Sequence, residues 1–263
     1  MADIADIFSP DGALAARLPG FSYRKAQQEM AALVADALSM GRHAAIEAGT
    51  GIGKTFAYLV PVLVSGRRAI ISTGTRTLQD QLFARDLPLL GALLGRPVRI
   101  ALLKGRGNYL CWHRIETALH DGTRDAATLA ELRAIATWGR ASERGDLTEL
   151  EDFETDDGLR GTITSTVDNC LGQRCDFHDR CFVAAARRDA QAADVVIVNH
   201  HLLLADLALK DAGFGELLPG ADAVIVDEAH QLPDVAQQFF GLSASTRELE
   251  SLLRDLFSEA RSV

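Results

Sequence analysis

The sequence predicts an α/β fold in which helices cover a parallel sheet. Short apolar runs at 44–46, 68–72 and 98–103 alternate with segments whose apolar residues recur at helical spacing, as in β-α-β units. A glycine-rich turn follows the first run directly, and polar clusters end the later runs at 194–200 and 223–230. Because ligands of open α/β sheets bind at the carboxyl ends of strands, these clusters are expected to form one site.

Residues 47–55 form a glycine-rich segment that predicts a phosphate-binding loop. Its glycines would let backbone N–H groups surround an anion at the N-terminus of the following helix. Lys54 would then reach the outer phosphates of a nucleotide, and the Thr55 hydroxyl would ligate Mg²⁺. Ala48 occupies the first glycine position of the pattern, at little cost if that residue needs no positive φ. The nucleotide-binding residues expected here are Ala48, Gly49, Thr50, Gly51, Ile52, Gly53, Lys54 and Thr55.

Two polar residues precede this loop on a helix expected at 23–38. Arg24 and Gln27 lie one turn apart on that helix. A glutamine amide both donates and accepts hydrogen bonds, which is the pattern needed to read the N6 and N7 edge of adenine. On a helix surface alone Gln27 would simply be solvated, so its position upstream of the loop is what favours adenine binding. The loop also has a simpler interpretation, a glycine-rich turn that carries a solvated lysine.

Two acids follow the apolar run at 223–226 and supply the partner that a phosphate-binding loop requires. Asp227 would hold Mg²⁺, directly or through water, and Glu228 would act as general base on the attacking water. Carboxylates at this position also suit a helix N-terminus, so a capping role is the alternative. The phosphate-binding loop in the same chain favours a catalytic role, with Lys54 and Glu228 as catalytic residues.

Composition indicates an ordinary globular chain and excludes several classes of protein. The 263 residues are 48% apolar, and no apolar run is as long as a membrane span. The start of the chain lacks the basic residues of a signal peptide, so a cytoplasmic location and no membrane partner are expected. A net charge of −9 argues against indiscriminate binding to polyanions but allows a local basic patch, for which 96–114 is the candidate.

The α/β pattern stops between residue 111 and about residue 185, and every cysteine lies in this stretch. Three of the four follow a C-x4-C-x5-C spacing. Since the chain shows no secretory signal, metal or cluster ligation is favoured over disulfides. The spacing does not distinguish an iron–sulfur cluster from a tetrahedral zinc site, and unligated thiols are a third interpretation.

The polar motifs together resemble those of a known group of motor proteins. Residues 48–55 and the Asp-Glu-Ala-His box at 227–230 look like motifs I and II of superfamily-two DEAH helicases. Arg24 and Gln27 are similar to the adenine-reading Q motif, and residues 73–81 are similar to motif Ia.

The interruption narrows the resemblance to one family. The segment 105–111, the three later cysteines and the run 198–202 are similar to the XPD-like iron–sulfur DNA helicases, in their bacterial DinG/YoaA branch. The run 198–202, the Asp-Glu-Ala-His box and residues 231–234 look closest to its YoaA members. The resemblance covers roughly residues 20–260.

This resemblance implies a RecA-like phosphate-loop domain with a parallel sheet, interrupted by a small helical iron–sulfur cluster domain. The implied boundaries are a mobile lead-in at 1–19, the first part of RecA-like domain 1 at 20–103, the cluster domain at 104–187, the second part of domain 1 at 188–238, and the start of an arch domain at 239–263.

The resemblance also implies roles for single residues. One [4Fe–4S] cluster would be ligated by Cys111, Cys170, Cys175 and Cys181. Contacts to the DNA backbone would come from Thr73, Thr75, Arg76, Lys104, Arg106 and Asn199, each of which also has a purely structural interpretation. His230 would couple the nucleotide site to motion.

The function implied is that of an ATP-dependent 5′-to-3′ DNA helicase in DNA repair or replication. Its cofactors would be ATP, Mg²⁺ and the [4Fe–4S] cluster, and its partners single-stranded, forked or duplex DNA and a replicative polymerase accessory subunit. Such a motor needs a second RecA-like domain with arginine fingers, so little hydrolysis is expected from the 263 residues alone. Two alternatives are a non-enzymatic ATP- and DNA-binding iron–sulfur module and a zinc-containing phosphate-loop ATPase.

Overall fold

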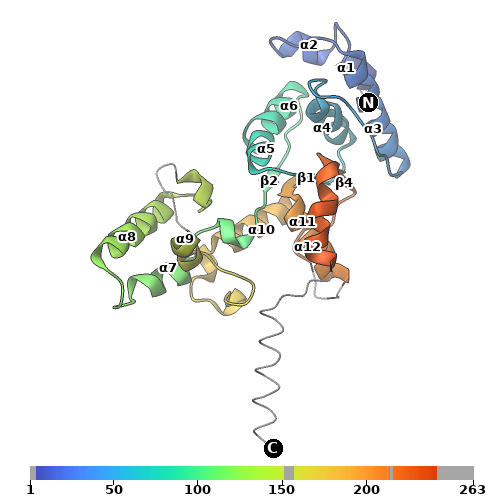
Figure 1. The fold of residues 1–263 in the computed structure, drawn as a ribbon. Helices are drawn as coiled ribbons and strands as arrows, with labels where there is room; N and C mark the ends of the chain where they lie inside the picture. The colour runs from blue at the N-terminus through green and yellow to red at the C-terminus, as the bar shows by residue number, and fades with distance from the viewer. Residues whose placement is uncertain (1–3, 151–156, 212, 214–215, 242–263) are drawn as a thin grey trace, which may run out of the picture.

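The computed structural model describes residues 4–150, 157–211, 213 and 216–241. A four-stranded parallel sheet with helices on both faces forms one part of the molecule, and a helical unit lies to one side of it (Figure 1). The predicted α/β class with a parallel sheet is therefore confirmed. Most of the predicted arch-domain start, from residue 242 onward, falls outside the described residues.

The sheet has the order β2-β3-β1-β4, and all its pairs are parallel. Its strands are β1 (Ala69–Thr73), β2 (Ile100–Leu102), β3 (Val195–Asn199) and β4 (Ala223–Val226). The two central strands consist largely of β-branched residues and are buried on both faces, as expected for a sheet covered by helices. Since β1 lies between β3 and β4, the polar residues after these three strands meet at one edge.

Helices from both ends of the chain cover the two faces of the sheet. One face packs against helices that precede β2, namely α3 (Lys25–Met40), α4 (Lys54–Ser65) and α6 (Leu87–Leu93). The opposite face packs against α10 (Phe182–Ala192) and α11 (His200–Asp211). The remaining elements beside the sheet are α1 (Ile4–Ile7), α2 (Ala13–Arg17), α5 (Arg76–Gln81), the π-helical turn η1 (Leu82–Asp86), η6 (Ala229–Gln231) and α12 (Leu232–Phe240).

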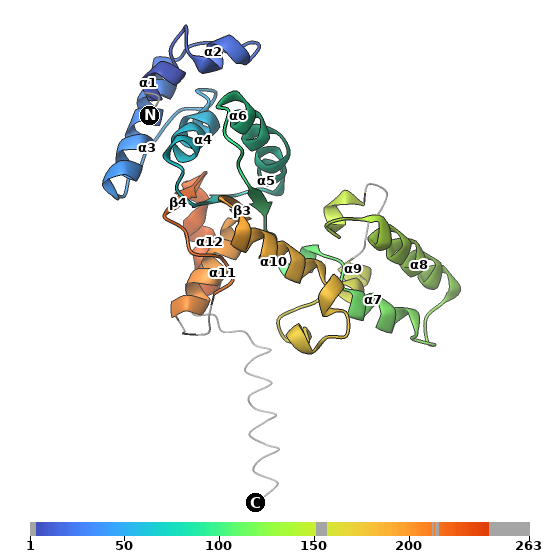
Figure 2. The same ribbon diagram turned by 180° about the vertical axis from the view of Figure 1, so that it is seen from behind.

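The stretch between β2 and β3 is helical, as predicted, and packs around its own core. Trp112, Ile115, Leu132, Ile135 and Ile163 are buried together in that core. Because these residues bury one another, the unit does not depend on the sheet for its apolar contacts. It comprises α7 (Trp112–Leu119), α8 (Ala126–Ala141), α9 (Asp157–Ile163) and the short 3₁₀ turns η2 (Arg106–Asn108), η3 (Leu147–Glu149), η4 (Gly172–Arg174) and η5 (His178–Arg180). Seen from behind, α10 leads from this unit back to the sheet (Figure 2).

One expected strand does not form. The apolar run 44–46 before the glycine-rich turn has no strand assignment, and most of it is exposed. A strand needs a neighbour for its backbone N–H and C=O groups, and β4, at the edge of the sheet, is hydrogen-bonded only to β1 among the described strands. Ile46 still packs partly against the core below α4.

Among the described residues, none of the helices combines the length and apolar character needed to cross a membrane.

Candidate functional site

The glycine-rich turn leads directly into the N-terminus of α4. Gly51 and Gly53 have φ angles of 79° and 86°, a region that side chains rarely adopt, so both positions require glycine. Ala48 is not among the residues with positive φ, which explains why alanine is tolerated at the first glycine position. The helix dipole and the free N–H groups of α4 therefore face the turn and favour an anion there.

Arg24 and Gln27 support this turn from α3. The Arg24 guanidinium donates to the carbonyl oxygen of Gly51 at 2.5 Å, and the Gln27 amide donates to that of Gly53 at 2.9 Å. Gln27 is only 5% exposed. One N–H of the Gln27 amide is therefore engaged by the loop, and both side chains help to shape it. A glutamine amide has a second N–H and an acceptor oxygen, so the adenine-reading role stays a prediction.

Asp227 and Glu228 come to this turn from the end of β4. The Lys54 ammonium lies 3.4 Å from a Glu228 carboxylate oxygen, although the two are separated by 174 positions in the sequence. Asp227 Oδ2 accepts a hydrogen bond of 3.0 Å from the Tyr58 hydroxyl, one helical turn beyond Lys54. The structure thus brings the predicted phosphate-binding cation and both predicted acids together.

Tyr58 is a site residue that the sequence analysis missed. It is 3% exposed, and burial raises the pKa of its hydroxyl, which the charge of Asp227 raises further. The hydroxyl therefore stays protonated and donates to Asp227, while the Thr55 side chain approaches it as well. Spacing could have revealed it, since Tyr58 lies four residues after Lys54 in an otherwise apolar helix and so faces the same side.

Oxygen atoms of Thr55 and Asp227 are the ligand type that Mg²⁺ prefers, so the residues around Tyr58 fit this ion. In the described part of the chain, no three His, Cys, Asp or Glu side chains form a group that could hold a metal ion. His230, predicted to couple the site to motion, is 72% exposed, and its Nδ1 lies 3.4 Å from Glu228. It contacts the general-base candidate from the solvent side.

All four cysteines are free, and each lies in a loop or at the end of a short helix. Burial raises the pKa of the Cys111 thiol, and the neighbouring Cys181 and Cys175 raise it further. Burial lowers the pKa of the Arg187 guanidinium in α10, while the charges of Cys170 and Cys181 oppose this shift. By type, four free thiols suit an iron–sulfur cluster or zinc. In the described residues, however, no three of them are arranged so that they could hold a metal ion.

Comparison with known proteins finds helicase domains. A family model described as DEAD/DEAH box helicase matches residues 24–114, and one described as DEAD_2 matches residues 141–249. Both models describe helicase domains, and together they match most of the chain. Over 254 residues it is 48% identical to the ATP-dependent DNA helicase YoaA of Haemophilus influenzae and 47% identical to that of Escherichia coli. The matched residues make up 96% of this chain and 40% of each relative.

A more distant relative is the ATP-dependent helicase DinG of Mycobacterium tuberculosis. It is 39% identical over 246 residues, which covers 84% of this chain and 36% of the relative. The chain therefore spans about 40% of the length of the YoaA proteins that it matches.

The residues predicted to contact DNA differ in accessibility. Thr75 and Arg76 are exposed where β1 ends and α5 begins, while Arg106 and Asn199 are partly exposed. Thr73 is fully buried, and its hydroxyl donates to the carbonyl oxygen of Thr75. The Thr73 hydroxyl is therefore turned inward, and its predicted DNA contact stays a prediction.

Lys104 is a second buried residue among the DNA candidates. Its side chain is 3% exposed, and its ammonium lies 2.6 Å from Asp146 and 3.1 Å from Asp80. Burying a lysine requires carboxylate partners, and these two come from the helical unit and from α5. Lys104 therefore joins the helical unit to the sheet, and its charge is not available to a phosphate.

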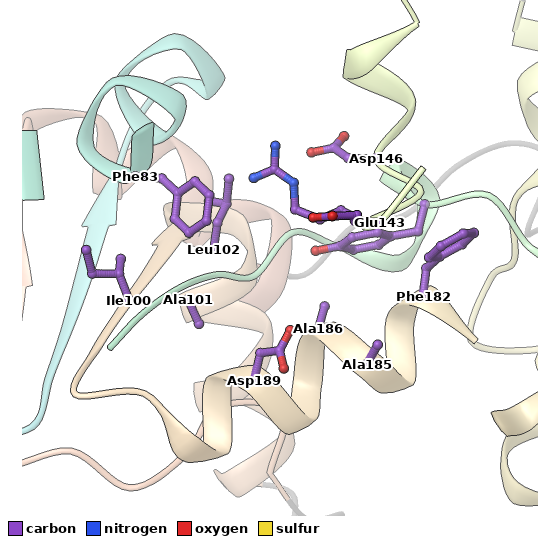
Figure 3. A pocket seen from close by; sticks show the side chains of 12 residues that line it. Phe83, Ile100, Ala101, Leu102, Glu143, Asp146, Phe182, Ala185, Ala186 and Asp189 are labelled. Atoms are coloured by element: carbon purple, nitrogen blue, oxygen red, sulfur yellow. The ribbon is translucent and has the colours of Figure 1, made fainter. Parts of the chain in front are cut away.

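A cavity of about 130 Å³ lies beside this junction (Figure 3). Side chains of β2 and η1, among them Leu102 and Phe83, line one side, and Asp146, Phe182 and Asp189 line the other. None of the predicted site residues lines it. The functional site is therefore the surface formed by the phosphate-binding loop and Asp227, and the cavity belongs to the junction of the two parts.

Replacing Gln27 by alanine tests its supporting role. We expect the loss of one partly buried hydrogen bond to weaken nucleotide binding about three- to tenfold, equally for ATP and GTP. Fluorescence titration with both nucleotides measures this, and Gln28→Ala, whose amide bonds the carbonyl of Ala5, is the control. A loss restricted to ATP would instead establish the adenine-reading role.

Replacing Lys104 by methionine tests the junction. Removing the cation leaves Asp146 buried without its partner, and we expect the free energy of unfolding to fall by about 3 kcal/mol in urea titrations. The exposed Arg76→Met is the matched control and should leave stability nearly unchanged. Weaker oligonucleotide binding by a fully stable Lys104→Met protein would contradict this assignment.

Proposed function

We propose that this chain is the nucleotide- and DNA-binding amino-terminal part of an ATP-dependent DNA helicase that acts in DNA repair or replication. The observation that carries the proposal is the approach of Lys54 to Glu228 and of Tyr58 to Asp227. A phosphate-binding loop opposite two acids at a strand end is the arrangement that nucleotide hydrolysis requires. The 47–48% identity to proteins named as DNA helicases supports the same reading.

Each residue of the site would have one task in hydrolysis. Backbone N–H groups at the start of α4, together with Lys54, would hold the phosphates, while Thr55 and Asp227 would hold Mg²⁺. This ion, when bound, supplies positive charge that offsets the charge of the phosphates. Glu228 would take the proton of the attacking water once the phosphates have drawn Lys54 away from it.

DNA would bind along the carboxyl edge of the sheet. Thr75, Arg76 and Asn199 lie at the ends of β1 and β3, and Arg106 begins the helical unit. Hydroxyl, amide and guanidinium groups of this kind position a nucleic-acid backbone without reading its sequence. The 5′-to-3′ polarity and a polymerase accessory subunit as partner stay predictions of the resemblance.

The helical unit between β2 and β3 would hold a [4Fe–4S] cluster through its four cysteines. We assign to Cys111, Cys170, Cys175 and Cys181 the role of ligands, because all four lie in the stretch between β2 and β3 and are free. The domain boundaries at 104 and 187 are part of this proposal. A second candidate function, an ATP- and DNA-binding module without turnover, differs only in whether single-stranded DNA accelerates ATP hydrolysis.

Replacing Lys54 by alanine tests nucleotide binding. We expect affinity for MgATP to fall about 10- to 100-fold, the effect of losing hydrogen bonds between a cation and phosphate. Lys25→Ala, which removes an exposed lysine of α3 paired with Glu29, is the control and should bind normally. Isothermal titration measures both, and equal affinities in the two variants would refute the nucleotide site.

Metal analysis of protein purified without oxygen tests the cluster. About four irons and four sulfides per chain are expected in the unaltered protein, and Cys175→Ser should lose most of them. Asp176→Asn, in the same loop, is the control and should keep its iron. About one zinc per chain without iron would replace the cluster by a zinc site and favour a phosphate-loop ATPase of another kind.

A further inference from the structure

A buried histidine lies directly behind the two acids of the site. His200, the first residue of α11, is 1% exposed. Its Nδ1 is 2.7 Å from the hydroxyl oxygen of Ser72, a fully buried residue of β1. Neither residue belongs to the machinery proposed above.

The other ring nitrogen of His200 has no partner. Nε2 is buried and makes no hydrogen bond within the described part of the chain. Burial lowers the pKa of the ring, so it is neutral near pH 7, while the backbone of Asp227 and Glu228 opposes this shift. A backbone carbonyl oxygen that accepts a hydrogen bond from a histidine ring raises the pKa of that ring. The effect of Asp227 and Glu228 therefore indicates that the ring faces the turn that carries both acids. A buried polar group without a hydrogen-bond partner is unfavourable, so a function that uses Nε2 would account for its position.

That turn is the place where the backbone needs support. Glu228 has φ 52°, and no other non-glycine residue of the described ranges has a positive φ. Such a conformation is strained and persists only where its surroundings impose it. Ser72 contacts both the turn and the histidine. Its carbonyl oxygen accepts a hydrogen bond of 2.9 Å from the Asp227 N–H, and its hydroxyl is hydrogen-bonded to His200.

We propose that His200 is a positioning residue that sets the Asp227–Glu228 turn for Mg²⁺ binding. The Ser72 hydroxyl donates to Nδ1, and the neutral ring therefore carries its hydrogen on Nε2, directed at the backbone of the turn. Asp227 accepts hydrogen bonds from the Tyr58 hydroxyl and from the backbone N–H of Glu228. Interaction of Nε2–H with the backbone of this turn holds the two carboxylates in the position from which Asp227 would bind Mg²⁺.

This inference rests on the proposed nucleotide site, and its test separates the two. Nucleotide affinity is measured by titration with ADP in excess Mg²⁺ and again in EDTA. The side chain of His200→Asn can replace Nδ1 but does not reach the position of Nε2, whereas His200→Gln reaches that position. We expect His200→Asn to need about 10- to 100-fold more Mg²⁺ for tight binding, with unchanged affinity in EDTA. His200→Gln should recover most of the loss.

Two further variants complete the design. His201→Asn makes the same change at the exposed neighbouring position and should bind Mg²⁺ and ADP normally. Ser72→Ala removes the donor that fixes the ring, so this variant should also need more Mg²⁺ for tight ADP binding, though less than His200→Asn does. It keeps the test decisive if His200→Asn does not fold.

The outcomes distinguish the inference from the proposed function. If His200→Asn and Ser72→Ala need no more Mg²⁺ than the unaltered protein, the inference is overturned and the nucleotide site is left intact. If their affinity for ADP falls equally in Mg²⁺ and in EDTA, and the melting temperature falls too, the residue is merely structural and the inference is again overturned. No ADP binding by the unaltered protein would overturn both.

Discussion

The contact between the start of α4 and the end of β4 is the interaction on which the site depends. Lys54 and Tyr58 project from one side of α4 toward Glu228 and Asp227, which are far away in the sequence. Each predicted catalytic group is therefore held by another protein group, so its charge or polar atom is not left unpaired.

The same requirement for paired polar groups explains the junction between the two parts of the molecule. Lys104 is buried where the chain leaves β2, and such a cation is tolerated only because Asp80 and Asp146 pair with it. The pairing links the helical unit to α5, which follows the strand end where DNA contacts are proposed.

The helical unit is an independent structure in terms of packing. Its aromatic and aliphatic residues, such as Trp112 and Phe182, bury one another, and Arg180 lies against the face of Trp112. The cysteines occupy its loops and helix ends, where a backbone can adapt to a bound group without disturbing the core. The sheet and the proposed cluster site can thus each be built around their own core.

The sequence by itself determined the α/β class, the phosphate-binding loop, the acids after β4 and the helical interruption. These are local signals, because strand burial, glycine conformations and helix periodicity each depend on neighbouring residues. Tertiary structure alone decided that Gln27 supports the loop, that Lys104 is buried between two acids, and that the run 44–46 finds no strand partner. Tyr58 and His200 likewise gained their partners, Asp227 and Ser72, only when α4 and α11 packed against the sheet. These partners lie 169 and 128 positions away in the sequence, so spacing could place Tyr58 on the face of Lys54 but could not identify either partner.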